Sequence, residues 1–293
     1  MRKFIFLFVV WFCMLPAFCQ IEQGQPHIGG RLKLSSCASV PAEQNFTLPG
    51  DHGKLSAVWH APADKKTYPL VLIMHGFNAN KEMALLIELS RQLNERGIAT
   101  LLFDFNGHGA SEGSFLDMTI PNELEDARRV YAYARKLPGV TSVSAVGHSQ
   151  GGVIVGMLAG ELGKQGLKSI VLMSPAPELK EDTAKGNLFG VQYDPQNPPE
   201  YITLPGGLKV GRAFLETTPH LPIYEVSSRY AGPVLVVHSK DDQLVPYRYG
   251  VEYSRIFPQA QLHTLRGFDH NFTRDIAAVD KIVADFFDKQ LNK

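Results

Sequence analysis

Short apolar runs alternate with longer mixed segments along most of the chain. Runs of this kind, bounded by Gly, Pro, Asn, Asp or Ser, occupy 70–75, 99–104, 143–147, 169–174, 234–239 and 261–265. Continuous apolar runs of this length indicate strands buried on both faces of a sheet. The runs 46–49 and 55–60 flank a turn-forming stretch and predict an initial antiparallel pair.

The intervening segments have helical length and periodicity. They cover 81–96, 120–137, 150–162, 247–257 and 273–290. The pattern is plainest where Leu124, Ala127, Val130 and Ala134 fall on one helical face. Strands that alternate with helices predict an α/β fold with a doubly wound, mostly parallel sheet. Ligands of such sheets bind outside the carboxyl ends of the strands, so the candidate chemistry is sought there.

The segment 175–226 breaks this alternation. It is rich in proline and glycine and shows a regular series only around 212–217. Connections of this length inside a compact domain are usually lids or binding loops. We therefore expect one core formed by 42–174 and 227–293, with 175–226 as an inserted lid over the site.

The N-terminus has the pattern of a secretory signal peptide. Arg2 and Lys3 precede an apolar run over 4–15, and the small residues Ala17 and Cys19 follow. The run is shorter than the roughly 20 residues that span a bilayer, so we expect cleavage after 19 rather than a stable membrane anchor. A flexible leader over 20–41 and a secreted or periplasmic protein are the corresponding predictions. A lipobox-like sequence ends at Cys37, but it lies at the wrong distance for a lipoprotein signal.

Composition and charge exclude several classes of protein. The chain of 293 residues is 44% hydrophobic and 20% charged, as in ordinary globular proteins. Lys and Arg number 29, as do Asp and Glu, so we expect no nucleic-acid partner, because that binding needs clustered positive charge. Three cysteines are too few for a disulfide scaffold. Removal of 1–19 leaves Cys37 as the one thiol, so we expect neither a disulfide nor a metal.

A nucleophile elbow is the strongest chemical signal. The sequence Gly-His-Ser-Gln-Gly at 147–151 fits the pattern G-x-S-x-G. It follows an apolar run and opens a predicted helix, which is the strand, turn and helix context that the motif requires. An ordinary glycine-rich turn is the alternative. We therefore predict Ser149 as a catalytic nucleophile.

A serine nucleophile needs a base and an acid that orients the base. Asp242 follows the run 234–239, and His270 follows the run 261–265, in the chain order Ser, Asp, His of this fold. We predict Asp242 as the orienting acid and His270 as the base. Asp241 is the alternative acid, with solvent exposure or helix capping as its expected role.

Neighbouring ionisable residues have simpler expected roles. We interpret Asp269 as a loop acid, His263 as a histidine packed within a strand, and His148 as structural and directed away from the nucleophile. The glycine-rich loop at 104–111 is expected to brace the site. His27, His52, His60 and His220 have no motif around them.

Two backbone N–H groups are expected to form an oxyanion hole. Gln150, which follows the nucleophile, is the first donor, and Phe77, in the His-Gly-Phe sequence after the run 70–75, is the second. No metal-ligand cluster accompanies these residues, and we expect no cofactor.

Several motifs together resemble one family. They are His-Gly-Phe at 75–77, Asp-Phe-Asn-Gly-His-Gly at 104–109, Gly-His-Ser-Gln-Gly-Gly at 147–152, Leu-Pro-Ile-Tyr-Glu at 221–225 and Asp-His at 269–270. In these the chain resembles the bacterial cinnamoyl and feruloyl esterases of the α/β-hydrolase fold, from about Phe46 to its end and most strongly after Ser144. The resemblance implies a serine esterase that releases hydroxycinnamates such as ferulate from plant cell-wall sugars or small esters.

The resemblance also implies roles in the lid, where an Asp and a Tyr of the family reach the ring hydroxyl of the acyl group. Asp182 lies at about the matching acidic position, with Glu181 beside it, whereas Phe214 stands where the Tyr is expected. Loss of that phenol leaves plain cinnamoyl or short acyl esters open as substrates. The other roles for these residues are a solvated acid and a packed aromatic.

Two further functions remain open at this point. One is a generic short-acyl esterase or peptidase-like hydrolase that uses the same three residues. The other is a ligand-binding protein on a hydrolase scaffold that has lost catalysis. This function is disfavoured, because the sequence has a residue of the right type at the nucleophile, acid and base positions.

Overall fold

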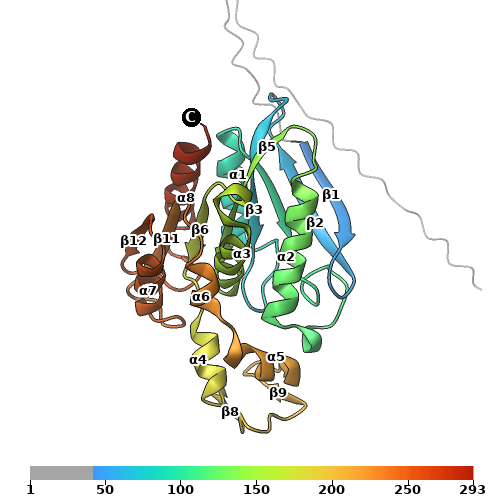
Figure 1. The fold of residues 1–293 in the computed structure, drawn as a ribbon, viewed down its shortest axis with the longest axis vertical. Helices are drawn as coiled ribbons and strands as arrows, with labels where there is room; N and C mark the ends of the chain where they lie inside the picture. The colour runs from blue at the N-terminus through green and yellow to red at the C-terminus, as the bar shows by residue number, and fades with distance from the viewer. Residues whose placement is uncertain (1–41, 293) are drawn as a thin grey trace, which may run out of the picture. The chain divides into compact units, whose positions relative to one another are not determined.

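The computed structural model describes residues 42–292 (Figure 1). The predicted signal peptide 1–19 and leader 20–41 lie outside the described residues. Eight strands form one sheet in the order β1-β2-β4-β3-β5-β6-β11-β12. Their bounds are β1 (Ala42–Pro49), β2 (Lys54–Ala61), β4 (Ala99–Phe103), β3 (Tyr68–Met74), β5 (Val140–His148), β6 (Ile170–Met173), β11 (Val234–Ser239) and β12 (Ala260–Leu265). The first two junctions are antiparallel and all the others are parallel, which confirms the predicted fold class.

Helices cover both faces of the sheet. On one face α1 (Ala84–Glu95) packs beside α8 (Ile276–Leu291), and on the other lie α2 (Ile120–Ala134), α3 (Gln150–Gly166) and α7 (Arg248–Ile256). Successive residues of β3 enter opposite layers, since Leu72 packs in the core under α2 and α3 and Ile73 in the core under α1 and α8. This alternation explains why central strands read as continuous apolar runs.

The edge strand β12 departs from the prediction of a buried strand. Leu262 and Leu265 are half-buried, whereas His263 and Thr264 are exposed. The expectation that His263 is packed is therefore wrong. The cause is position, because β12 has a neighbouring strand on one side alone and the flanking helices cover it incompletely.

The lid has more regular structure than its sequence predicts. It contains α4 (Glu178–Ala184), two hairpins formed by β7 (Asn187–Leu188) with β8 (Val191–Gln192) and by β9 (Tyr201–Thr203) with β10 (Lys209–Gly211), and α5 (Arg212–Thr217). These elements lie together at one end of the molecule, at the bottom of Figure 1. Leu188, Val210 and Phe214 are fully buried and continue the core under α2 and α3. The lid is therefore packed onto the core of the α/β domain.

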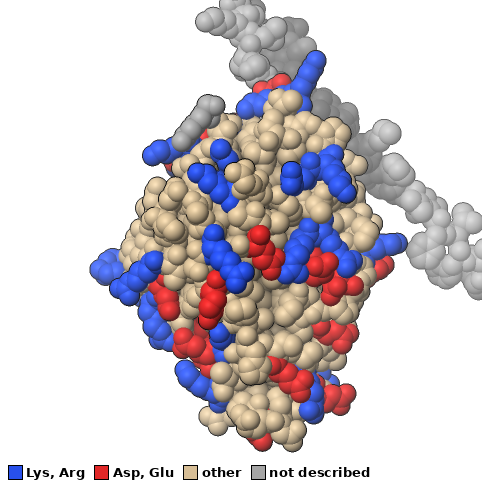
Figure 2. Space-filling model, in the orientation of Figure 1, with Lys and Arg blue, Asp and Glu red and all other residues tan. Residues whose placement is uncertain are grey.

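The chain returns to the core through α6 (Ile223–Ser227), which packs against α3. This helix crosses the predicted end of the lid at residue 226. Figure 2 shows Lys and Arg interspersed with Asp and Glu across the middle of one face of the molecule. This mixing agrees with the equal numbers of acidic and basic residues in the sequence.

Candidate active site

Ser149 occupies a strained turn between β5 and α3. Its backbone has φ 57° and ψ −123°, a conformation that non-glycine residues rarely adopt. The flanking glycines are required by space, since a Cβ on Gly147 lies 2.1 Å from the carbonyl oxygen of Gly151, and one on Gly151 lies 2.4 Å from that of His75. The turn therefore fits the nucleophile elbow that the motif predicts.

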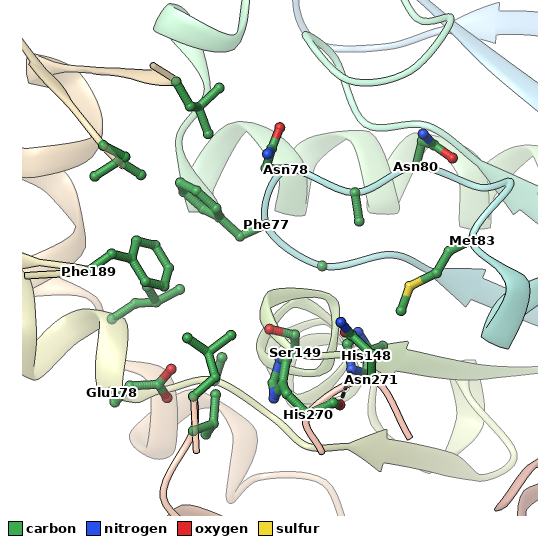
Figure 3. Close-up of a pocket in the computed structure, with 18 of the residues that line it drawn as sticks. Phe77, Asn78, Asn80, Met83, His148, Ser149, Glu178, Phe189, His270 and Asn271 are labelled. Carbon is green, nitrogen blue, oxygen red and sulfur yellow. Dashed lines mark hydrogen bonds between the residues drawn. The ribbon is translucent and has the colours of Figure 1, made fainter. Parts of the chain in front are cut away.

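Asp242 and His270 meet at the ends of β11 and β12. Asp242 Oδ2 lies 2.8 Å from His270 Nδ1, and both side chains are buried. Asp242 Oδ1 accepts hydrogen bonds of 2.9 Å from the backbone N–H groups of Leu244 and Val245. His270 Nε2 has no partner among the described residues, and His270 lines the same cavity as Ser149 (Figure 3). The structure thus brings the three predicted residues together, with the free imidazole nitrogen available as a base.

Asp242 is held in its ionised form. Burial by itself raises the pKa of this carboxyl, but hydrogen bonds from His238 and His270 and the charge of His270 outweigh burial and bring the pKa below its ordinary value. His238 Nε2 lies 3.4 Å from Asp242 Oδ2 and 3.0 Å from the carbonyl oxygen of Val245. Sequence reasoning missed His238, because a histidine at the end of a buried strand carries no motif.

The competing acids do not contact the base. Asp241 is exposed and accepts a hydrogen bond of 2.6 Å from the backbone N–H of Gly267. Asp269 accepts a hydrogen bond of 2.7 Å from the backbone N–H of Thr273. Both acids therefore stabilise loops, as expected for Asp269, and geometry favours Asp242 as the orienting acid.

His148 contributes more to the site than expected. Its Nε2 lies 2.9 Å from the carbonyl oxygen of His270, and the two rings lie 4.8 Å apart. Burial, together with the charge of His270, lowers the pKa of His148 to about 3, so the ring is neutral and donates its Nε2 proton to this carbonyl. The structural role expected for His148 is confirmed, since its ring supports the loop of the base, and the residue also lines the cavity.

The candidate oxyanion donors lie on either side of the nucleophile. A Cβ on Gly76 lies 2.8 Å from Ser149 Cβ, so the loop that holds Phe77 runs directly against the nucleophile. Gln150 is the first residue of α3, where backbone N–H groups have no intrahelical partner. Both positions are therefore suited to the predicted role of donating a backbone N–H to an oxyanion. At Gln150 the positive end of the α3 helix dipole also attracts negative charge.

A buried polar cluster stands behind Gln150. The side-chain Nε2 of Gln150 donates a hydrogen bond of 2.6 Å to Glu123 Oε2. The other oxygen of Glu123, Oε1, lies 3.8 Å from His108 Nε2. Burial, together with nearby Asp126, raises the pKa of Glu123 to about 8 against the opposing effect of the Gln150 hydrogen bond. Glu123 is therefore a neutral acid that holds the Gln150 side chain. Its sequence position on an amphipathic helix predicts no such role.

The loop 104–111 has the bracing role that we expected. The Asp104 carboxylate is fully buried and accepts hydrogen bonds of 2.7 Å from both the backbone N–H and the Nζ of Lys81. His75 Nε2 accepts a hydrogen bond of 3.1 Å from the backbone N–H of Phe105. These bonds tie the loop that contains Phe77 to the end of β4.

The cavity at Ser149 has a volume of about 850 Å³ and two unlike sides. On the lid side its wall includes Phe77 and Phe189, whose rings lie 5.2 Å apart. Asn80, Asn271 and Met83 line it on the side opposite Phe189, and Asn78 lies next to Phe77 (Figure 3). The nucleophile thus lies between an apolar side and a polar side.

The two lid residues predicted to bind substrate are absent from the wall of this cavity. Asp182 is half-buried on α4, and Phe214 is fully buried with its ring 5.8 Å from that of Phe77. Phe214 is therefore a packed aromatic behind the wall. Glu178, one helical turn before Asp182, lines the cavity instead.

The described part of the chain contains neither a metal-binding cluster nor a membrane-spanning helix. No cluster of three or more His, Cys, Asp or Glu residues within 42–292 is placed to hold a metal ion. No helix in that range is sufficiently long and apolar to cross a membrane.

Comparisons with known proteins agree with this geometry. A family model described as alpha/beta hydrolase fold matches residues 69–203, and one described as TAP-like protein matches 212–291. The chain is 32% identical to Est1E from Butyrivibrio proteoclasticus, whose structure contains ferulic acid, with a TM-score of 0.80 over 84% of this chain and 98% of that one. The chain belongs to the α/β-hydrolase family and is a serine hydrolase.

More distant relatives have other names. The chain is 25% identical to human protein ABHD12B, over 86% of this chain and 74% of that protein. It is also 25% identical to the lysophosphatidylserine lipase ABHD12 of Danio rerio, over 78% of this chain and 61% of that protein. Of these two names, only the second states an activity, that of a lipase for lysophosphatidylserine.

Proposed function

We propose that the protein is a carboxylic ester hydrolase of feruloyl type, which releases hydroxycinnamates through an acyl-enzyme on Ser149. The observation that carries this proposal is the aromatic side of the cavity, where Phe77 and Phe189 line the same cavity as the nucleophile. Flat aromatic acyl groups pack well against such rings. The likeness to Est1E, which was solved with ferulic acid, supports the same substrate class.

The proposed reaction follows from the positions of the three residues. Ser149 Oγ attacks the ester carbonyl while His270 Nε2 takes its proton, and Asp242 holds the Nδ1–H of His270. The oxyanion receives hydrogen bonds from the backbone N–H groups of Phe77 and Gln150. The intermediate then expels the alcohol, which takes its proton from His270. Water, deprotonated by His270, then attacks the acyl-enzyme carbonyl. The second intermediate expels Ser149 Oγ, which takes the proton back from His270, and the carboxylic acid is released.

Each part of the ester is proposed to bind one of the two sides of the cavity. The apolar lid side receives the aromatic acyl group. The polar side receives the alcohol, because the amides of Asn80 and Asn271 offer donors and acceptors to sugar hydroxyl groups. This assignment supports esters that join a hydroxycinnamate to a cell-wall sugar.

A panel of esters tests the proposal. We expect rapid hydrolysis of methyl ferulate and methyl cinnamate, slower hydrolysis of p-nitrophenyl acetate, and little of lysophosphatidylserine. Turnover of p-nitrophenyl acetate alone would indicate the short-acyl esterase, and preference for the lysophospholipid would indicate the activity named for the ABHD12 relatives.

The role of Ser149 is tested separately from substrate preference. The Ser149→Ala variant is expected to lose hydrolysis of every ester and labelling by a fluorophosphonate probe. A wild-type protein that fails to react with the probe would favour a ligand-binding protein without catalysis.

We also propose that the protein is exported, on the strength of the charged and apolar pattern over 1–19. Expression of the full chain in a bacterial host, followed by mass spectrometry of the extracellular or periplasmic fraction, should find a mature N-terminus at Gln20. An intact Met1 in the membrane fraction would contradict export by cleavage.

A further inference from the structure

Glu178 is a buried acid with an unused oxygen on the wall of the cavity. It lies in the first turn of α4, is 7% exposed, and lines the same cavity as Ser149 (Figure 3). Its Oε2 is buried and has no hydrogen-bond partner among the described residues. Buried polar atoms in folded proteins are nearly always bonded, so the carboxyl group of Glu178 has hydrogen-bonding capacity that residues 42–292 leave unused.

The surroundings of Glu178 hold it in a neutral form. Burial is the main cause, and the nearby acids Asp182, Asp242 and Glu181 add to it, so the pKa of Glu178 lies well above its ordinary value. A neutral carboxylic acid donates one hydrogen bond and accepts others, whereas a carboxylate only accepts. Glu178 therefore offers both a donor and an acceptor to a ligand.

Glu178 is the one polar residue that the described lid contributes to the cavity wall. The other lining residues that the described lid contributes are apolar: Ala176, Leu179, Phe189, Leu204, Pro205 and Leu208. A carboxyl group in such a wall discriminates between acyl groups with and without a polar substituent. A site that is built to hydrogen-bond a hydroxyl rejects the analogue that lacks it, because the polar group is then left unpaired.

We propose that Glu178 determines acyl specificity by hydrogen bonding to an oxygen substituent, hydroxyl or methoxy, on the aromatic ring of the substrate. This inference rests on the proposed function and refines it, since it places the selective acid one helical turn before Asp182. Asp182 is half-buried outside the cavity wall, and its charge is partly offset by Lys185.

The test compares methyl p-coumarate with methyl cinnamate, which differ by one ring hydroxyl. The quantity measured is the ratio of the two kcat/KM values for wild type, Glu178→Leu, Glu178→Gln and the control Glu181→Gln. We expect Leu to lower the ratio by about five- to tenfold, the range of one neutral hydrogen bond. Gln, which keeps a donor and an acceptor, should retain most of the ratio. Glu181 is exposed on the same helix, so its variant should leave the ratio unchanged.

The possible outcomes separate the two proposals. An unchanged ratio in Glu178→Leu, with both esters cleaved by wild type, overturns the role of Glu178 and leaves the proposed function intact. Equal losses on both esters indicate a structural role and also overturn it. A wild-type protein that cleaves neither ester overturns the proposed function together with this refinement. Should Glu178→Leu fail to fold, the same comparison is made with Glu178→Met and with product inhibition by p-coumarate against cinnamate.

Discussion

Replacement of Asp242 by Asn tests how the site orients its base. In the native site, Asp242 Oδ2 accepts the Nδ1–H of His270 at 2.8 Å, while Oδ1 accepts two backbone N–H groups. Asn retains an oxygen for the two backbone donors, so its amide nitrogen faces His270. The N–H of the Asn amide and the Nδ1–H of His270 would then both point at each other as donors. The imidazole avoids this by changing tautomer, so that Nδ1 becomes an acceptor. The proton moves to Nε2, which can no longer accept a proton from Ser149.

The expected loss is large because it affects the proton transfer itself. The same exchange of tautomer in other serine hydrolases lowers kcat by about 10⁴-fold, which corresponds to roughly 5.5 kcal/mol of activation free energy. KM should change little, since Asp242 does not line the cavity. Folding should be largely retained, because the two backbone hydrogen bonds keep an acceptor.

The assay is the steady-state hydrolysis of methyl ferulate and p-nitrophenyl acetate by Asp242→Asn, with Asp241→Asn as the matched control. Asp241 is exposed, so its variant should stay within about threefold of wild type. Circular dichroism and thermal melting verify that both variants fold. A kcat for Asp242→Asn above about one tenth of wild type, or a greater loss in Asp241→Asn, would refute the assignment of the orienting acid.

Three further predictions concern packing and buried acids. Gly151→Ala should abolish activity and lower the melting temperature, because its Cβ lies 2.4 Å from the carbonyl oxygen of His75. Glu123→Gln should retain kcat within about threefold, whereas Glu123→Leu should lower it by about tenfold, since only Gln still accepts the hydrogen bond from Gln150. Asp280 has two buried oxygens without a partner among residues 42–292, and burial, reinforced by Glu88, raises its pKa to about 9. The folded state therefore keeps a proton that the unfolded state releases, and wild-type stability falls as pH rises between about 4 and 9; Asp280→Asn removes this loss. Urea denaturation should show an advantage of Asn that grows by at most ~1.4 kcal/mol per pH unit from pH 5 to pH 8, and a constant difference would contradict the reasoning.

The positions of the central strands along the chain follow from local sequence patterns. Ser149, Asp242 and His270 were predicted because each lies a few residues after a predicted strand, in the chain order Ser, Asp, His. Parallel strands bring their carboxyl ends to one edge of the sheet. The glycines at 147 and 151 also mark the position of the nucleophile, since the tight turn around Ser149 leaves no room for side chains there. Local periodicity and steric exclusion operate over a few residues, so they can be read along the chain.

The lid and the edge of the sheet were less predictable. Strands of two or three residues, such as β7 and β10, are too short to show a period of two. His263 lies in a strand pattern, and its exposure depends on where the helical layers end. The lid residues Asp182 and Phe214 were assigned from a resemblance. Glu178 and Asp182 lie on the same face of α4, one helical turn apart, so they differ in their position along the helix axis. The packing of the lid brings Glu178, and not Asp182, to the cavity wall.

Along the chain, the residues define a serine hydrolase fold with its candidate nucleophile, base and orienting acid. Their support depends on contacts between distant segments: His148 with the loop of His270, and Glu123 with Gln150. Burial of Glu178 and Glu123 decides that both acids are neutral, and burial exists only once the core and lid have packed. Sequence patterns report the identity and spacing of side chains, whereas packing sets their protonation and their partners.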